Sequence, residues 1–164
     1  MNTESTIIKG TNGNDELVAG FYDEEIYGYD GDDTLTAGMG GSILVGGKGD
    51  DILYGGLGEN TYIYNLGDGS DTIYLLTNYD TLSIVGHCRK EDLYFEKKGN
   101  TIIVTFANMP GKITLEMGDF ENNLDKILLN GQEVYNYEDL YLIEGTEEMN
   151  DIYGKRISEI IIIA

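Results

Sequence analysis

The chain has few of the features that staple, kink or target a protein. It has one cysteine, Cys88, so no internal disulfide can form. It has one proline and no tryptophan, and no apolar run long enough to span a bilayer. The first residues, 1–6, lack the basic and apolar regions of a Sec signal peptide. We therefore expect no transmembrane segment and no Sec-type signal.

Basic residues are also scarce. Ten lysines and arginines stand against thirty acidic residues, which gives a formal net charge of −20. This balance argues against nucleic acid and anionic membranes as partners, because both are polyanions. It favours cations instead. The hydrophobic share of 41% is sufficient for a packed core.

Glycine, in contrast, is abundant and periodic. A nine-residue pattern repeats without a gap over residues 10–63, in six copies: 10–18, 19–27, 28–36, 37–45, 46–54 and 55–63. The fifth copy reads Gly-Gly-x-Gly-x-Asp-x-apolar-x without a mismatch. A seventh copy, 66–74, follows a two-residue insertion of Tyr64 and Asn65, which should bulge the roll or end its regular winding. A flexible linker would not place an apolar residue at every ninth position.

The apolar eighth position of each copy predicts the core. Its occupants are Leu17, Ile26, Leu35, Leu44, Leu53, Tyr62 and, in the seventh copy, Ile73. Six loop residues followed by three alternating strand residues cannot fold alone, but stacked copies pair laterally into two parallel sheets. The predicted fold is all-β, a parallel β-roll (right-handed β-solenoid) with a β-rich C-terminal cap.

One full coil takes two copies, so the loops of copies 1, 3, 5 and 7 form one edge, the odd edge, and those of copies 2, 4 and 6 form the even edge. The sixth loop position holds Asp15, Asp33, Asp51 and Asp71 on the odd edge, and Glu24, Ser42 and Asn60 on the even edge. Carboxylates stacked about 4.8 Å apart repel unless a cation lies between them. An all-oxygen shell suits Ca²⁺ better than Mg²⁺, which sheds water reluctantly. We predict about three Ca²⁺ ions on the odd edge and few or none on the even edge.

Residues 8–74 resemble the repeats-in-toxin (RTX) family of haemolysin-type calcium-binding repeats. The resemblance implies that loop carbonyls and the sixth-position aspartate hold the ions. Carried over to this chain, the implied ligands are Gly10, Asn12, Asp15, Gly28, Asp30, Gly31, Asp33, Gly46, Lys48, Gly49, Asp51, Asp68, Gly69 and Asp71. Copies 2, 4 and 6 depart from the motif.

Residues 75–142 resemble, more weakly, the region that often follows such repeats, through Asp80-Thr81-Leu82 and residues 91–95, 101–106 and 112–115. They predict strands at 101–106 and 112–116, and a hairpin of 126–129 and 132–135 joined by Asn130-Gly131. This region should cap the roll. Residues 143–164 read as a degenerate repeat with a C-terminal tail, whose last residues resemble type I export signals or form a terminal strand.

A catalytic role is not indicated. His87 and Cys88 cannot complete a tetrahedral zinc site and lie in no nucleophile motif. Together with the RTX resemblance, the sequence predicts a non-catalytic calcium-binding module of a bacterial secreted or surface protein. The resemblance implies that it folds on binding Ca²⁺ after export, with a type I exporter as a partner. Two alternatives stay open: an adhesin or polysaccharide-binding module that uses outward tyrosines such as Tyr27, Tyr54 and Tyr74 to bind a surface glycan, and a fragment of a larger toxin or enzyme.

Overall fold

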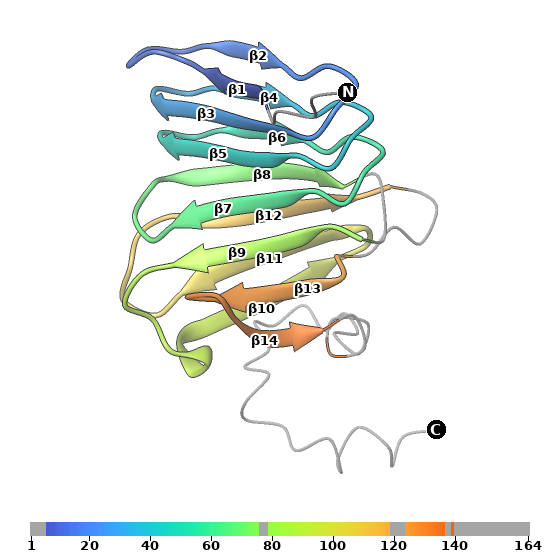
Figure 1. The fold of residues 1–164 in the computed structure, drawn as a ribbon. Helices are drawn as coiled ribbons and strands as arrows, with labels where there is room; N and C mark the ends of the chain where they lie inside the picture. Colours follow the sequence, from blue (N-terminus) through green and yellow to red (C-terminus); the bar gives the residue numbers. More distant parts are fainter. Residues whose placement is uncertain (1–5, 76–78, 119–123, 137–138, 140–164) are drawn as a thin grey trace.

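The computed structural model describes residues 6–75, 79–118, 124–136 and 139. Two seven-stranded sheets lie face to face, and the chain alternates between them as it coils (Figure 1). Sheet A contains, in spatial order, β1 (Thr6–Lys9), β3 (Glu24–Asp30), β5 (Ile43–Lys48), β7 (Thr61–Asn65), β9 (Thr81–Val85), β13 (Lys126–Leu129) and β14 (Gln132–Asn136). Sheet B contains β10 (Leu93–Lys98), β11 (Thr101–Phe106), β12 (Lys112–Met117), β8 (Ser70–Leu75), β6 (Ile52–Tyr54), β4 (Thr34–Thr36) and β2 (Glu16–Val18).

The strand register confirms that one coil takes two nonapeptides. In sheet B, Leu17 lies beside Leu35, and Leu35 lies beside Leu53, eighteen residues further on each time. In sheet A, Ile26 pairs in the same way with Leu44. All of these pairings are parallel, as the stacked copies predict. Equivalent residues of successive coils are therefore neighbours along the roll, and the two edges are rows of equivalent loops.

The predicted inward column forms the core between the sheets. Ile26, Leu35 and Leu44 have no exposed surface, and Leu53 and Ile73 are almost as deeply buried. Leu17 is only partly buried, because β2 is the last strand of sheet B and has a neighbour on one side alone. Burying a side chain of this size contributes about 1.5–3 kcal/mol, so the apolar column is the main source of stability.

The two-residue insertion does not end the winding. Tyr64 and Asn65 extend β7, where they pair with Ile84 and Val85 of β9. Because strand side chains alternate with a period of two, a two-residue insertion keeps every later side chain on its proper face. It also turns Tyr64 inward, where it is 2% exposed and stacks on Phe106 at a ring-centroid distance of 5.5 Å.

The region after the repeats continues both sheets. Strand β12 pairs in parallel with β8, and β13 pairs in parallel with β9. The antiparallel strands β10, β11 and β14 are then added outside them, after a short 3₁₀ turn, Lys90–Asp92. The predicted strands and the Asn130-Gly131 hairpin turn are confirmed, and both turn residues have positive φ, 52° and 80°. The predicted degenerate repeat and tail, 143–164, lie outside the described residues.

Candidate metal centre

The sixth-position aspartates of the odd edge form a hydrogen-bonded row. The backbone N–H of Asp15 donates to Oδ1 of Asp33 at 2.8 Å, and that of Asp33 donates to Oδ1 of Asp51 at 2.8 Å. The N–H of Asp51 donates to Oδ1 of Asp71 at 3.2 Å. The carboxylates of Asp33, Asp51 and Asp71 thus each accept a hydrogen bond from the preceding coil with one oxygen. The predicted stacking of these four residues is what the fold produces.

The second carboxylate oxygen, Oδ2, has no hydrogen-bond partner among the described residues in two of these aspartates. Oδ2 of Asp33 and Oδ2 of Asp51 are buried and have no hydrogen-bond partner in the described part of the chain. Both atoms lie against a first-position glycine of their own loop: Asp33 Oδ2 against Gly28 and Asp51 Oδ2 against Gly46. A buried carboxylate oxygen without a donor is costly. A cation beside it would remove that cost.

A backbone carbonyl points at the same place. A Cβ atom built on Gly28 would meet Asp33 Oδ2 and, at 2.5 Å, the carbonyl oxygen of Gly46 from the next coil. A Cβ on Gly10 would meet Asp15 Oδ2 and the carbonyl oxygen of Gly28, both at 2.7 Å. The missing side chain therefore leaves room where a carboxylate and a carbonyl from successive coils converge. This is the donor set that a hard cation prefers.

The pKa values of the aspartates in the row are consistent with a cation site between the loops. Burial raises the pKa of Asp33, raises that of Asp51 to about 6 and raises that of Asp71 to about 8, and the neighbouring aspartates add to each increase. Without a cation, the folded protein thus disfavours the charged form of these groups. A positive ion between the loops would reverse that preference.

The first loop differs from the rest. Thr11 occupies the second position, and its backbone N–H and hydroxyl donate to Asp15 Oδ2 at 2.6 and 2.9 Å. Asp15 is also only half-buried. Its carboxylate is therefore satisfied by its own loop, unlike those of Asp33 and Asp51. A cation in the first gap would have to compete with Thr11.

The middle loops need left-handed backbone at their fourth position, where Gly31 and Gly49 have φ of 128° and 137°. Their N–H groups donate to the carbonyls of Lys48 and Asp68 at 2.8 and 2.7 Å. Two of the implied ligand carbonyls, those of Lys48 and Asp68, are therefore already hydrogen-bonded, with a second lone pair each. Of the implied ligands, the structure brings the aspartates and the first-position glycines together most closely.

Among the described residues, no three histidine, cysteine, aspartate or glutamate side chains gather into a metal-binding cluster. An ion on the odd edge must therefore take most of its ligands from backbone carbonyls. The residues fit this requirement, because the carboxylates of Asp15 and Asp33 each lie beside a glycine carbonyl of the next coil. Such a shell suits Ca²⁺, which accepts six to eight oxygen ligands in flexible geometry.

The even edge satisfies its carboxylates differently, although the Ser42 hydroxyl on this edge is buried without a hydrogen-bond partner among the described residues. Asp80, fully buried, receives the N–H and Nδ2 of Asn60 at 3.0 and 3.1 Å and the hydroxyl of Tyr62 at 3.2 Å. The carboxylate of Glu24 accepts the N–H of Gly20. Neutral protein donors thus do on this edge what a cation would do on the other.

Asp80 is the sixth-position residue of an eighth copy that the sequence prediction did not include. The loop before Asp80 contains no glycine, so the periodic glycines that mark the other copies do not reveal this one. The signal that could have found it is the Asp-Thr-apolar triplet Asp80-Thr81-Leu82, which repeats Asp33-Thr34-Leu35 and Asp71-Thr72-Ile73.

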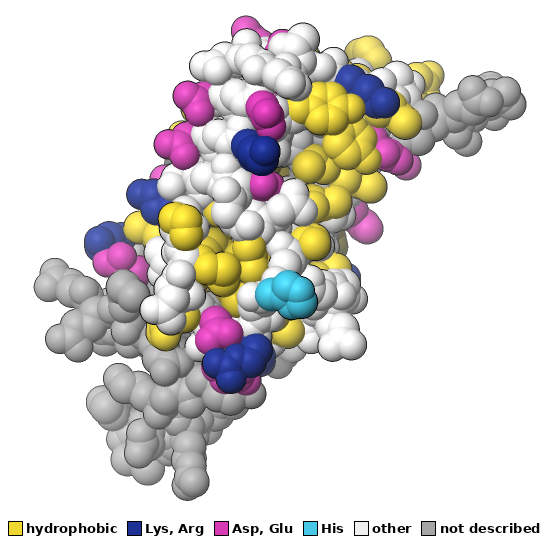
Figure 2. Space-filling model, turned by 90° about the vertical axis from the view of Figure 1, so that its left-hand side faces the viewer, with side chains coloured by type: hydrophobic (Ala, Val, Ile, Leu, Met, Phe, Trp, Pro, Cys, Tyr) yellow, Lys and Arg dark blue, Asp and Glu magenta, His cyan; other side chains and the backbone are white. Residues whose placement is uncertain are grey.

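A groove of about 460 Å³ lies beside the odd edge on the outer face of sheet A. Its lining residues are Asn12, Tyr27, Tyr29, Asp30, Val45, Gly47, Lys48, Asn65 and Asp68. Tyr27 and Tyr29 stack at a centroid distance of 6.3 Å. Figure 2 faces the odd edge and shows acidic side chains along it, with a hydrophobic patch beside them. This groove brings four of the implied ligand residues to the rim of an aromatic surface.

The outward tyrosines do not form a single face. Tyr27 belongs to β3 of sheet A, whereas Tyr54 and Tyr74 belong to β6 and β8 of sheet B. Tyr54 and Tyr74 stack on each other at 4.8 Å on the opposite side of the roll. The physical reason is the alternation of successive copies between the two sheets.

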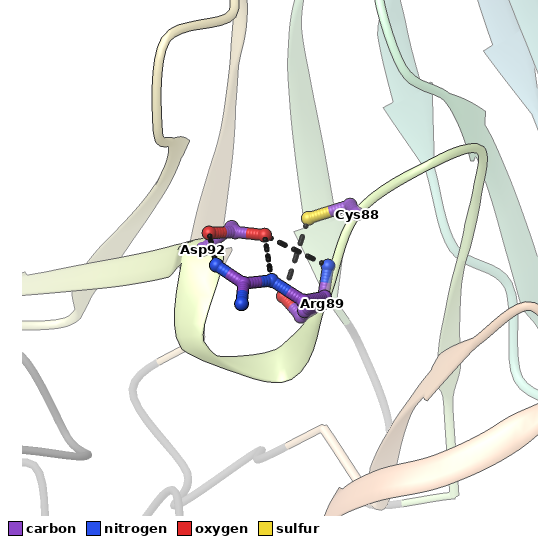
Figure 3. Close-up of polar contacts among 3 residues, drawn as sticks. All are labelled: Cys88, Arg89 and Asp92. Carbon is purple, nitrogen blue, oxygen red and sulfur yellow. Dashed lines mark hydrogen bonds and ion pairs between the residues drawn. The ribbon is translucent and has the colours of Figure 1, made fainter.

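The His87–Cys88 segment lines a smaller hollow near the end of the roll. Asp92 accepts Nε of Arg89 at 3.1 Å, Nη2 at 3.0 Å and the Arg89 N–H at 3.0 Å, as Figure 3 shows. The Cys88 thiol donates to the Arg89 carbonyl, and burial raises its pKa. These contacts fix a turn and keep the thiol protonated, which is the opposite of nucleophile activation.

The fold and the odd edge together show which class of protein domain this is. It is a parallel β-roll wound from nonapeptides, with one edge of acidic, glycine-rich loops. The model of the RTX calcium-binding nonapeptide repeat family matches residues 9–44 and 40–73, with four copies. Residues 9–73 therefore belong to that family, and they form an RTX calcium-binding repeat domain.

Alignments of this chain with solved structures of similar fold extend beyond the repeats. The extracellular lipase LipA of Serratia marcescens is 26% identical with a TM-score of 0.58, over 75% of this chain and 20% of the lipase. The AlgE6R3 and AlgE6R2 subunits of the Azotobacter vinelandii mannuronan C5-epimerase are 24% and 22% identical, with TM-scores of 0.57 and 0.60. They align with 78% and 82% of this chain and with 84% and 98% of their own lengths.

The chain thus spans a fifth of the lipase's length. No curated protein sequence matches it significantly. In the described part of the chain, no helix has the length and apolarity needed to cross a membrane.

Proposed function

We propose that the odd edge binds about three Ca²⁺ ions, one in each gap between its four loops, and that binding drives folding of the roll. The main evidence for this site is the pair of buried carboxylate oxygens without a hydrogen-bond partner in the described part of the chain, Asp33 Oδ2 and Asp51 Oδ2. The converging carbonyl of Gly46 and the raised pKa values of the aspartates support the same site.

The ligands we propose are the sixth-position aspartates and the loop carbonyls that face them. The full set is Gly10, Asn12, Asp15, Gly28, Asp30, Gly31, Asp33, Gly46, Lys48, Gly49, Asp51, Asp68, Gly69 and Asp71. Within it we place the strongest gap between the loops of Asp33 and Asp51, because there both a free carboxylate oxygen and a facing carbonyl are present. We place the weakest at Asp15, whose carboxylate Thr11 already satisfies.

Magnitudes support a folding role. With a dissociation constant near ~0.1 mM and about 1–2 mM free calcium, each ion adds about 1.5 kcal/mol. Three ions add roughly 4–5 kcal/mol, comparable with the whole stability of a small domain. The acidic row opposes compaction when no ion is bound, so the roll should be largely unfolded in low calcium.

In this proposal the chain has three parts: a calcium-binding roll at 8–74, a β-rich cap at 75–142, and a degenerate repeat with a tail at 143–164. It is a non-catalytic module of a secreted or surface bacterial protein that passes through a type I exporter while loose and folds outside the cell. It can be part of a larger toxin or enzyme, since it aligns with only 20% of the length of the extracellular lipase.

The test is far-UV circular dichroism of chelator-stripped protein during a calcium titration, with magnesium as the control ion. We expect a cooperative gain of β-sheet signal at submillimolar to millimolar calcium and none with magnesium. A fully folded metal-free protein that calcium does not change, by spectrum or by thermal stability, would refute the folding switch.

A second candidate function is the binding of a surface glycan in the groove on sheet A. Sugar rings pack on aromatic faces, and amides and carboxylates bind their hydroxyls. The stacked Tyr27 and Tyr29 with Asn12 and Asn65 supply both elements. Asp30 and Asp68 at the rim favour a neutral glycan over an acidic one.

This candidate is tested by screening neutral and acidic oligosaccharides against the calcium-loaded protein. Tyr29→Ala should abolish binding, whereas Tyr74→Ala, which removes an exposed tyrosine from the other sheet, should not. Equal loss with both variants, or no binding by the wild type, would reject the groove as a glycan site.

A further inference from the structure

The even edge carries a row of exposed apolar side chains that neither the core nor the metal centre uses. At the third position of its loops stand Phe21, Met39 and Leu57, which are 74%, 59% and 62% exposed. Tyr22, next to Phe21, is 73% exposed. The equivalent residues of the odd edge are all polar or charged: Asn12, Asp30, Lys48 and Asp68. We name Phe21, Tyr22, Met39 and Leu57 the apolar ridge.

The ridge is a regular structure, because its residues occupy equivalent places in successive coils. The N–H of Met39 donates to the carbonyl of Gly20 at 3.3 Å, and that of Leu57 donates to the carbonyl of Gly38 at 3.1 Å. The loops therefore stack with the spacing of neighbouring strands, about 4.8 Å. They follow β2, β4 and β6 at the upper right of the roll (Figure 1).

The surroundings of the ridge are poor in charge. The middle loop, 37–42, contains no charged residue, and the exposed charges of the two flanking loops are Asp23 and Glu59. The carboxylate of Glu24 is buried and accepts the N–H of Gly20. On a chain of net charge −20, two copies meet with less repulsion at this edge, where Met39 lies in an uncharged loop, than at the acidic odd edge.

We propose that the apolar ridge is a self-association surface, on which a second copy of this chain docks antiparallel. A two-fold axis through the middle loop places Met39 opposite the partner copy's same residue and Phe21 opposite Leu57. Both rows have the same spacing, so their side chains can interdigitate into a dry contact, as stacked strands do in paired sheets.

The area available predicts the strength of this contact. Taking about 150–250 Å² for a large side chain, the exposed fractions give roughly 500 Å² of apolar surface per chain and roughly 1,000 Å² for two copies. This lies at the lower limit of specific interfaces, so we expect a weak, reversible dimer with a Kd in the micromolar range. Exposed patches of this size also mark interaction sites in monomeric proteins.

The first test is analytical ultracentrifugation of the full chain over a concentration series in millimolar calcium. The proposal does not depend on metal binding at the odd edge, and circular dichroism of each variant confirms that it is folded. Met39→Lys and Leu57→Lys should each raise the Kd by at least about tenfold. The matched control, Val85→Lys, replaces a 39% exposed apolar residue of sheet A and should leave the Kd unchanged.

A wild type that stays monomeric at high micromolar concentration would overturn the proposal, as would a dimer that both ridge variants leave intact. Binding of monomeric protein to zwitterionic lipid vesicles, lost in Met39→Lys, would overturn it in favour of a lipid surface.

The second test fixes the orientation by disulfide cross-linking in a Cys88→Ser background. Met39→Cys should cross-link with itself under mild oxidation. Phe21→Cys and Leu57→Cys should each cross-link poorly alone but efficiently when the two proteins are mixed. Efficient self-cross-linking of Phe21→Cys and of Leu57→Cys, with no gain when the two proteins are mixed, would contradict the antiparallel arrangement.

Discussion

The backbone N–H of Asp33 donates a 2.8 Å hydrogen bond to Oδ1 of Asp51, eighteen residues further along the chain, while Oδ2 of Asp51 is buried without a partner. One carboxylate thus has two roles. Its first oxygen joins successive coils, as any polar turn residue could. Its second oxygen provides a ligand that the protein alone leaves unsatisfied, which is the basis of the proposed calcium site.

Removing the charge of Asp33, the neighbouring aspartate of the row, should have opposite effects on the calcium-bound and the metal-free protein. Asp33→Asn retains a side-chain acceptor for the N–H of Asp15 but loses the negative charge. We expect the calcium midpoint of folding to rise on the order of tenfold, because fewer charges hold the ion. In chelator, the same variant should be more stable than the wild type, since a buried charge is gone.

Calcium titration followed by circular dichroism measures the midpoint, and the folded fraction of each protein in chelator, from the same spectra, measures the metal-free stability. Ser42→Ala, at the equivalent position of the even edge, is the matched control and should leave the calcium midpoint nearly unchanged. Equal shifts in the two variants would refute the assignment of the ions to the odd edge.

The metal-free protein should become less stable as the pH rises. The pKa of Asp51 is raised to about 6 and that of Asp71 to about 8, from an ordinary value of 3.8, chiefly by burial. Below pH 4 both groups are protonated in the folded and unfolded states. Above pH 4 the unfolded chain releases these protons while the folded chain retains them, so stability is lost as the pH rises through about 6 and then about 8.

The folded fraction in chelator, followed by circular dichroism between about pH 4 and pH 9, measures this loss. Asp71→Asn should flatten the upper part of the profile. In calcium the trend should reverse, because the ion binds the ionised carboxylates. A metal-free stability that increases over this range would show that these aspartates do not control it.

A methyl group at the first loop position should block the metal centre. A Cβ on Gly46 would overlap Asp51 Oδ2, whereas a Cβ on Gly13 meets nothing closer than Thr11 Oγ1 at 3.9 Å. Gly46→Ala should destabilise the calcium-loaded protein by about 1–3 kcal/mol and weaken calcium binding, and Gly13→Ala should do neither. Isothermal calorimetry and denaturant unfolding in calcium compare the two; similar behaviour would exclude a tight site at Gly46.

The even edge should be stabilised independently of calcium. Asp80→Ala removes the acceptor for Asn60 and for the Tyr62 hydroxyl and leaves buried donors unsatisfied. We expect a loss of about 3 kcal/mol in the free energy of unfolding of the calcium-loaded protein, which excess calcium should not recover. Denaturant unfolding of the calcium-loaded variant and wild type, repeated at increasing calcium concentrations, measures this loss. A loss that excess calcium fully restores would instead place an ion at Asp80.

Much of the fold could be predicted because its determinants are local and periodic. The apolar residue at every ninth position predicted Ile26, Leu35 and Leu44 as core, and Asn130-Gly131 predicted the last hairpin. The eighth copy was missed because the loop before Asp80 has no glycine. The extension of β7 by Tyr64 was missed because an insertion shows its effect only when the strand finds a partner.

The winding, the core column and the difference between the two edges follow from the repeat alone, since a strict period assigns each residue to a face without knowledge of its neighbours. Which polar groups are satisfied depends instead on how the folded chain packs. Asp33 and Asp80 are both buried sixth-position aspartates, but Asp80 meets Asn60 and Tyr62, whereas one oxygen of Asp33 meets no donor. Satisfaction of a buried charge depends on groups a whole coil away, and those are placed by packing.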